Sequence, residues 1–171
     1  SDISLVSVDN ISYTCDSGIF YISLTPTTDQ FGNSFISITL TDAGNLTALT
    51  SFELTVNSVN DSPEIGSIAN QTTDEDIAIH SISLTATDIE TAVCSMDLTF
   101  GSSDISLVSV DNISYTCDSG IFYISLTPTT DQYGNSSISI TLTDAGSLTA
   151  ATSFELTVNS INDSPVIGSI A

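Results

Sequence analysis

The acidic side chains are the groups in this sequence with the clearest capacity for chemistry. The chain carries 21 Asp and Glu residues and no Lys or Arg, giving a formal net charge of -21 at pH 7. Because no basic side chain can pair with them, water, dissolved cations or bound metal must neutralise these carboxylates. The same composition excludes nucleic acid and anionic membrane surfaces as partners, since both are bound through basic residues.

Catalysis by these acids is a weaker interpretation than metal binding. Asp74 and Asp76 are spaced like a pair of acids that could act on sugars, but they lie at a repeat boundary. His80 is the only histidine, and no spacing marks a nucleophile or a second metal ligand beside it. Sugar binding through aromatic platforms is disfavoured because Trp is absent. We therefore expect no enzyme.

The chain repeats itself with a period of 102 residues, so that residues 1–69 recur as residues 103–171 without a gap. A period of this length suits one small domain per repeat. The two copies differ at six positions, which are Phe31/Tyr133, Phe35/Ser137, Asn45/Ser147, Leu49/Ala151, Val59/Ile161 and Glu64/Val166.

The three cysteines follow the repeat. Cys15 and Cys117 are equivalent, whereas Cys94 lies in a stretch without a counterpart in the first copy. One bridge per repeat is the natural pairing, and alternation places both Cys94 and Cys117 on inward faces. A disulfide between them would stabilise the fold by roughly 3 kcal/mol in an oxidising compartment. Cys15 would then lack its partner because the first copy is truncated.

Apolar residues alternate with Ser and Thr throughout the full repeat. The pattern is clear at 82–87, 93–100, 113–117, 121–126, 138–143 and 154–158, with turn signals between these runs and no 3.6-residue apolar stripe. About seven short strands per hundred residues predict an antiparallel β-sandwich of immunoglobulin type. The fold class is therefore all-β, with tandem immunoglobulin-like antiparallel β-sandwiches arranged end to end.

The repeat pattern also predicts domain boundaries. Residues 1–62 form an incomplete first repeat that lacks its front strands, residues 63–164 a complete sandwich, and residues 165–171 the start of a following repeat. Half a sandwich exposes an apolar face and unpaired edges, so the first repeat must be completed. Upstream chain could supply the missing strands, or a neighbouring subunit could donate them.

The segments at the repeat boundaries resemble a known family. VNSVNDSPEI (56–65) and VNSINDSPVI (158–167), with TTDEDIAI (72–79) and TATDIE (85–90), resemble the cadherin-like tandem repeats of giant bacterial surface adhesins and extracellular fibres, which carry N-D-x-P linkers. This resemblance covers essentially the whole chain. It implies Ca²⁺ at the junctions, and Ca²⁺ takes six to eight oxygen ligands.

In that topology the acids gather at the two ends of a repeat. The implied ligands between the two copies are Asp29, Asn60, Asp61, Asp88, Glu90 and Asp144. Those at the downstream junction are Glu75 or Asp76, with Asp131, Asn162 and Asp163. The family's usual D-R-E is replaced by Asp29-Gln30-Phe31 and by Asp131-Gln132-Tyr133, which removes one carboxylate per junction. We therefore expect weak affinity, with Kd of about 10⁻⁴ to 10⁻³ M. These acids could also be solvated turn residues.

Two mechanical functions are consistent with these observations. The first is a structural repeat of a long extracellular adhesin or fibre at the cell surface, with junctions rigidified by Ca²⁺. The second is a self-assembling filament whose subunits exchange β-strands. In both cases the expected partners are neighbouring repeats of the same chain or identical subunits, in a polymeric or fibrous assembly. No apolar run reaches the roughly 18 residues of a membrane span.

The absence of Lys and Arg predicts resistance to trypsin that does not depend on folding. After reduction and denaturation in urea, incubation with trypsin should leave the 171-residue chain intact by mass spectrometry. A protease specific for Glu should cut the same sample. A tryptic fragment ladder from the verified sequence would contradict the prediction.

Overall fold

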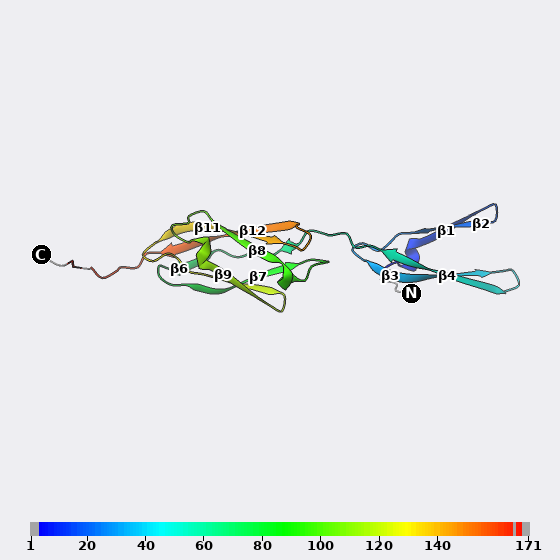
Figure 1. Cartoon of the computed structure of the whole chain (residues 1–171), viewed down its shortest axis with the longest axis horizontal. Coiled ribbons are helices and arrows are strands. Elements are labelled where there is room, and N and C mark those ends of the chain that lie inside the picture. The colour runs from blue at the N-terminus through cyan, green and yellow to red at the C-terminus, as the bar shows by residue number, and fades with distance from the viewer. Residues whose placement is uncertain (1–3, 166, 169–171) are drawn as a thin grey trace. The chain divides into compact units, whose positions relative to one another are not determined.

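The computed structural model describes residues 4–165 and 167–168 and forms two compact units, Ser1–Val59 and Asn60–Ala171. Each unit is described by itself. Unit 2 is an all-β sandwich, and unit 1 consists of two β-hairpins (Figure 1). Asn60 and Asp61, which the sequence analysis assigned to the first repeat, hydrogen-bond within unit 2. Over the described residues the only helices are three-residue 3-10 turns, and none has the length and hydropathy of a membrane span.

The first sheet of unit 2 contains four antiparallel strands. Their order is β5 (Glu64–Ile65), β7 (Ile79–Thr87), β10 (Ile121–Leu126) and β9 (Ile113–Asp118). β10 pairs with β9 through a tight turn in which Ser119 and Gly120 both have positive φ. β7 pairs with the opposite edge of β10, so that β10 is a central strand.

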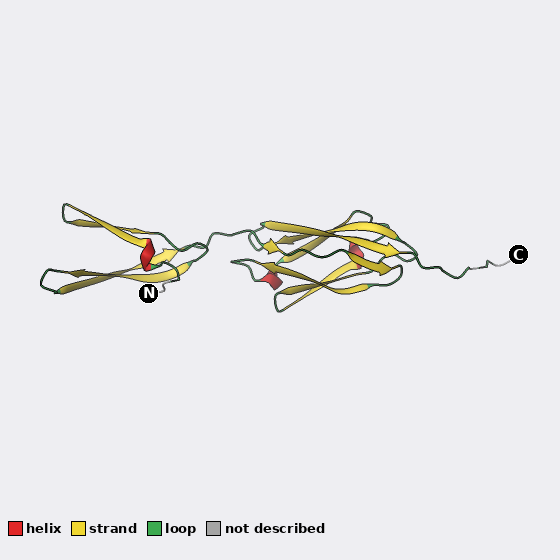
Figure 2. Ribbon diagram, turned by 180° about the vertical axis from the view of Figure 1, so that it is seen from behind, coloured by secondary structure: helices red, strands yellow, loops and turns green. Residues whose placement is uncertain are grey.

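The second sheet contains β6 (Gln71–Asp74), β12 (Thr149–Asn159), β11 (Gly134–Thr143) and β8 (Asp97–Ser102), in that order. β6 pairs with β12 in parallel, and the other pairs are antiparallel. The first strand of the sandwich is thus divided between the sheets, with β5 in one and β6 in the other. Figure 2 shows the two sheets of unit 2 as two layers.

The core of unit 2 lies between these sheets. Alternate residues of β10 and β11 point inward, and Phe122, Ile124, Ile138 and Ile140 are each 0% exposed. Burying one such side chain stabilises the fold by roughly 1.5–3 kcal/mol. The alternation predicted from the sequence therefore forms the core, and the all-β sandwich class is confirmed.

A disulfide joins Cys94 to Cys117 beside this core, with 5.5 Å between their Cα atoms. The prediction that strand phase turns Cys94 inward is wrong. Residues Val93–Ser95 form a 3-10 turn, β8 begins only at Asp97, and Cys94 is exposed. Cys117 lies in β9 and is half-buried. Cys15, the equivalent of Cys117, is free and exposed.

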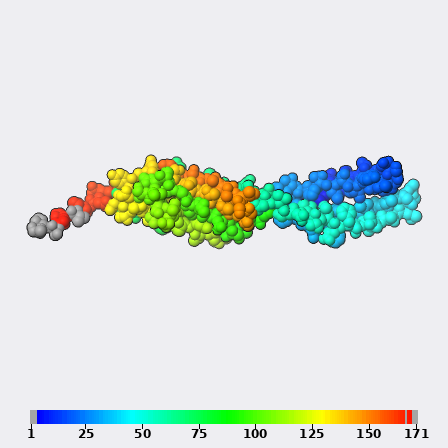
Figure 3. All heavy atoms as spheres, turned by 45° about the horizontal axis from the view of Figure 1, so that its top comes forward, coloured from blue at the N-terminus to red at the C-terminus, as the bar shows by residue number. Residues whose placement is uncertain are grey.

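Unit 1 contains the hairpins β1 (Ile11–Asp16) with β2 (Ile19–Leu24), and β3 (Gly32–Thr41) with β4 (Thr47–Val56). Leu5, Val6 and Ile36 are the buried apolar residues among the described part of unit 1. Toward their turns the hairpins separate, and the space-filling view shows two distinct layers there (Figure 3).

The same sequence is therefore buried in one unit and exposed in the other. Phe122 is 0% exposed in unit 2, whereas the equivalent Phe20 is 50% exposed. Leu142 is likewise 0% exposed and its equivalent Leu40 is 54% exposed. The covering strands β5 to β8 of unit 2 account for this difference, because they have no counterparts among the described residues of unit 1.

This difference predicts unequal effects of two identical substitutions. Phe122→Ala should lower the free energy of unfolding of unit 2 by about 3–5 kcal/mol, because it removes a fully buried ring and leaves a cavity. Phe20→Ala, the matched change in unit 1, should leave unit 2 within about 0.5 kcal/mol of the parent. Urea unfolding monitored by NMR at amides of β10 and β11 measures both. Equal losses would show that Phe122 is not part of a packed core.

Candidate functional site

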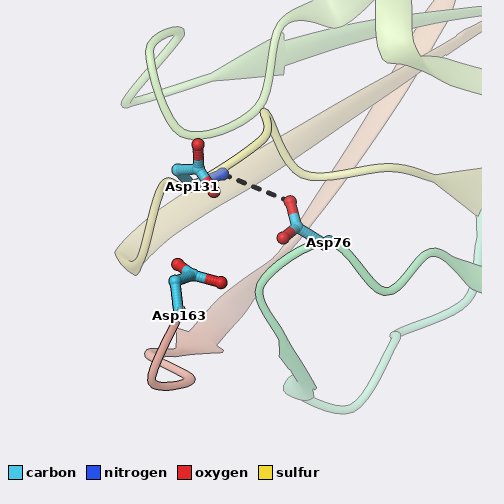
Figure 4. A group of neighbouring side chains, drawn as sticks. All are labelled: Asp76, Asp131 and Asp163. Carbon is cyan, nitrogen blue, oxygen red and sulfur yellow. Dashed lines mark hydrogen bonds between the residues drawn. The ribbon is translucent and has the colours of Figure 1, made fainter. Parts of the chain in front are cut away.

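Three carboxylates meet where the chain leaves the sandwich of unit 2. Asp76 lies in the turn after β6, Asp131 in the loop between β10 and β11, and Asp163 beyond β12 (Figure 4). One oxygen of each lies within 4.8 Å of one oxygen of each of the others. We call this group the C-terminal cluster. Its three members were all predicted from the sequence as ligands at the downstream junction.

Local backbone chemistry positions two of these acids. Asp76 has φ 65° and Asp131 has φ 56°, a left-handed conformation that Asp adopts more readily than most residues. The Asp131 backbone N–H donates to Asp76 Oδ1 over 3.2 Å, which ties the two loops together (Figure 4). The cluster is therefore held by its own turns and does not depend on a basic partner.

The buried Glu75 side chain hydrogen-bonds to the segment that leads to the C-terminal cluster. It is 5% exposed, and its Oε1 accepts hydrogen bonds from the Ile161 N–H at 2.6 Å and the Ser160 hydroxyl at 3.4 Å. The Glu75 N–H donates to the Asn159 carbonyl. These bonds anchor the chain that leads to Asp163. The Asn162 side chain, also predicted as a ligand, donates to the Asp163 carbonyl over 3.2 Å.

A second group of polar side chains lies where the chain enters unit 2. We call it the N-terminal cluster, and it contains Asn60, Asp61, Asp88, Glu90 and Asp144. Asn60 Nδ2 donates to Asp144 Oδ2 over 2.8 Å, and the Asp61 N–H donates to Glu90 Oε2 over 3.1 Å. The structure thus brings together five of the six residues predicted for this junction. Asp29, the sixth, lies in unit 1 in the turn before β3.

Two carboxylates of the N-terminal cluster, those of Asp144 and Asp88, are shielded from solvent to different extents. Asp144 is 6% exposed, and its Oδ1 accepts from the Leu148 N–H over 2.8 Å. Asp88 Oδ1 accepts from the N–H groups of Glu90 and Thr91, at 3.0 and 2.6 Å. Asp88 Oδ2 is buried and has no hydrogen-bond partner. A buried anionic oxygen without a partner is costly, so this atom is suited to receive a cation.

Gly146 is a residue of this site that the sequence analysis missed. A Cβ at this position would lie 2.4 Å from Asn60 Cγ, so any other residue would displace the Asn60 side chain that donates to Asp144. The sequence DAG at 144–146 is a turn signal and no more. It gave no signal that a distant linker residue packs against it.

Asp104 shows how the fold holds a carboxylate outside the clusters. The Ser106 hydroxyl donates to Asp104 Oδ1 over 2.6 Å, and the N–H groups of Leu107 and Ser106 donate to the same oxygen. These bonds lower the pKa of Asp104, and desolvation opposes them. A lowered pKa favours the folded state above the ordinary pKa of Asp, and this contribution disappears as the pH falls through the folded-state value.

Comparison with known proteins identifies the fold. The structure is similar to that of protocadherin gamma B2 extracellular cadherin domains 3-6, with a TM-score of 0.60, 17% identity, and coverage of 88% of this chain and 39% of that one. For a protocadherin gammaB7 EC3-6 cis-dimer structure the TM-score is 0.58 and the identity 20%, and the match covers 88% of this chain and 38% of that one. For the protocadherin gammaB4 extracellular domain the TM-score is 0.58 and the identity 19%, and the match covers 88% of this chain and 26% of that one.

These similarities define a class of fold. Unit 2 is a β-sandwich of the cadherin-like and immunoglobulin-like kind, as the sequence predicted. It spans well under half the length of these three structures. No protein-family model matches the chain. No curated protein matches it either.

The packing of Asn60 against Gly146 predicts a site-specific loss of stability. Gly146→Ala should displace the Asn60 side chain, break its bond to Asp144 and destabilise unit 2 by about 1 kcal/mol. Gly44→Ala is the matched change in unit 1, where a Cβ would meet only Asp42 Oδ1 at 3.3 Å. Hydrogen exchange at the amides of β11 and β12 measures the effect. Protection unchanged by Gly146→Ala would contradict the contact.

Proposed function

We propose that the chain is a structural repeat of a long extracellular adhesin or fibre, in which tandem β-sandwiches act as spacers and Ca²⁺ stiffens the ends of each sandwich. The observation that carries the metal part is the C-terminal cluster, in which three carboxylates from three separate loops have oxygens within 4.8 Å of one another.

The tandem part of the proposal rests on the repeat itself. Two copies of nearly identical sequence follow each other with a period of 102 residues, and the complete copy folds as a sandwich whose chain enters at one end and leaves at the other. The similar protocadherin gamma B2 structure consists of extracellular cadherin domains 3-6. Repetition of one sandwich extends the chain in space, and each copy can serve as a spacer without a binding or catalytic site of its own.

The donor set of the C-terminal cluster fits calcium. Oxygens bound to one Ca²⁺ at about 2.4 Å can be at most about 4.8 Å apart, which the three carboxylates satisfy. All three donors are oxygens, and oxygen ligands favour hard cations such as Ca²⁺ over zinc or copper. Because the chain contains no Lys or Arg, a metal ion is the strongest available neutralising partner.

The N-terminal cluster supports the same proposal through a different observation. Asp88 Oδ2 is buried without a hydrogen-bond partner, beside a loop that also carries Glu90. The Asn60 and Asp61 contacts already fix the linker onto this end of the sandwich. A bound cation would satisfy the Asp88 oxygen and restrain the linker further.

The disulfide and the charge support an extracellular location. Disulfides form and persist in oxidising environments, and Cys94 is bonded to Cys117. A net charge of -21 keeps separate chains soluble through mutual repulsion and raises the local concentration of divalent cations. Both properties suit a repeat on a cell surface.

Assembly into a filament by strand donation is the second candidate function. Its support is the free edge of β2 and β3 in unit 1, where the described strands pair only within their own hairpins. In that case a neighbouring subunit would supply the missing strands. Concentration-dependent polymerisation of the purified chain would favour this function over the spacer.

Calcium titration of the whole chain tests the proposed site. We expect weak binding, with Kd of about 10⁻⁴ to 10⁻³ M, seen as NMR shifts at the amides of 75–77, 130–132 and 161–163. At ten times Kd, binding should raise the free energy of unfolding of unit 2 by about 1.4 kcal/mol. Asp131→Asn should weaken binding by about tenfold, because it removes one charge from the donor set.

Asp118→Asn is the matched control for this experiment. Asp118 is exposed, ends β9 and lies outside both clusters, so the substitution removes the same charge without touching a proposed ligand. Equal weakening by both substitutions would show that Ca²⁺ responds only to net charge. Amide shifts that remain unchanged up to about 20 mM Ca²⁺ would remove the calcium part of the proposal.

A further inference from the structure

The hairpin of β3 and β4 in unit 1 carries two large apolar side chains on the face opposite its buried residues. Strand alternation puts the buried Ile36 on one face and the odd-numbered residues of both strands on the other, which we call the outer face. Phe35 and Leu49 both lie on the outer face, and they are 60% and 72% exposed. They therefore point away from the apolar residues that the hairpin buries.

Unit 2 shows that these positions stay exposed when the sandwich is complete. The residues equivalent to Phe35 and Leu49 are Ser137 in β11 and Ala151 in β12. Both are exposed, although β8 and β6 flank this hairpin in unit 2 and the other sheet covers its opposite face. The exposure of Phe35 and Leu49 thus follows from their positions on the outer face and does not depend on covering strands.

The two copies of the repeat differ at these same two positions. Of the six differences between the copies, Phe35/Ser137 and Leu49/Ala151 lie on the outer face, and both make that face more apolar in unit 1. Ser and Ala at these positions are sufficient for the hairpin, because β11 and β12 pair in the same register as β3 and β4. The larger side chains are therefore available for a contact outside the hairpin.

The positions of Phe35 and Leu49 suit a contact between two identical faces. Phe35 lies opposite Glu53, and Leu49 lies opposite Thr39, so the two apolar side chains are on different strands and four residues apart along the hairpin. The rise and spacing of β-strands put them about 14 Å apart. When two outer faces stack about a two-fold axis perpendicular to this line, Phe35 of each copy meets Leu49 of the other, which is the reciprocal contact of an isologous interface.

The same arrangement keeps the acidic groups of the two faces apart. Glu53 is the only carboxylate on the outer face, and it stays beside Phe35 of its own chain. Because the two Phe35 rings lie at opposite ends of the contact, the two Glu53 residues are on the order of 10 Å or more apart, about one Debye length in 0.1 M salt. The stacked faces therefore bring apolar groups together without opposing the acids.

We propose that unit 1 binds unit 1 of a second copy of this chain through the outer faces of β3 and β4, as a weak symmetric dimer with Phe35 of each copy against Leu49 of the other. Unit 2 does not form this contact, because it has Ser137 and Ala151 at the equivalent positions. The contact uses neither the acidic clusters nor exchanged strands. It therefore goes beyond the proposed function, as a side-by-side contact between chains.

Isotope-filtered NMR on a mixture of two samples of the whole chain tests the contact directly. One sample carries ¹³C-labelled leucine methyl groups and the other is unlabelled, and a chelator removes calcium. At about 1 mM chain, a concentration suited to a small and weak interface, we expect an intermolecular NOE between the Leu49 methyl groups and the Phe35 ring. The chemical shifts of the Leu49 methyl groups should change with chain concentration.

Three variants relate this signal to association measured by sedimentation equilibrium. Phe35→Ser with Leu49→Ala gives the outer face the residues of unit 2, and it should weaken dimerisation by at least about tenfold. Leu40→Ala, the matched control, removes an apolar side chain that is 54% exposed on the inner face, and it should leave the dimer affinity within about twofold. Ser137→Phe with Ala151→Leu gives unit 2 the same outer face and should produce assemblies larger than a dimer.

Salt separates this contact from an ionic one. Two chains of net charge -21 repel each other, so raising NaCl from about 0.05 to 0.5 M should strengthen the dimer. A monomer at every concentration would overturn the proposal, and so would association that weakens with salt. Concentration-dependent shifts at the Leu40 methyl groups, without an NOE from Leu49 to Phe35, would place the contact on the inner face and would also overturn it.

Discussion

Burial of alternate residues between two sheets is the constraint on which this structure depends. A strand presents only one face to the core, so its apolar residues are shielded only when a second sheet lies opposite. In unit 2 the hairpins β9–β10 and β11–β12 belong to different sheets, and the segment 64–102 contributes strands to both. That segment joins two separate hairpins into one closed sandwich. Unit 1 shows the same hairpins without it, and there the equivalents of core residues are exposed to solvent.

The absence of basic side chains imposes a second condition on the fold. Each Asp or Glu carboxylate that packs against the rest of the protein must accept its hydrogen bonds from N–H and hydroxyl groups, because the chain has no Lys or Arg side chain. Glu75, Asp88, Asp104 and Asp144 all accept from backbone N–H groups at turns or strand ends. The bonds of Asp88, Asp104 and Asp144 are local to their own turns, whereas the bond of Glu75 to Ile161 joins segments that lie far apart in sequence. Among the described residues, Asp88 Oδ2 is buried without a donor, and it lies in the N-terminal cluster.

Much of the fold could be predicted from the sequence because its strands alternate cleanly. Ile138, Ile140 and Leu142 stand out against Ser and Thr neighbours, and the phase of β11 could be read directly. Ser136 is in the same phase and is only 1% exposed, yet its type gave no such signal. It is buried because Ser102 and the Asp104 N–H hydrogen-bond to its hydroxyl, and these partners are remote in sequence. Cys94 was misplaced because a 3-10 turn interrupts the alternation just before β8.

The same distinction applies to the acidic clusters. Their membership could be predicted because the ends of a sandwich collect the loops, and the Asp residues occupy those loops. The contacts of Asn60 with Asp144 and of Glu75 with Ile161 could not be predicted, because they depend on where two loops approach in space.

The parallel pairing of β6 with β12 has a mechanical consequence. Tension on the two ends of unit 2 pulls these strands past each other in shear, so the four residue pairs between Gln71–Asp74 and 156–159 resist together rather than opening one at a time.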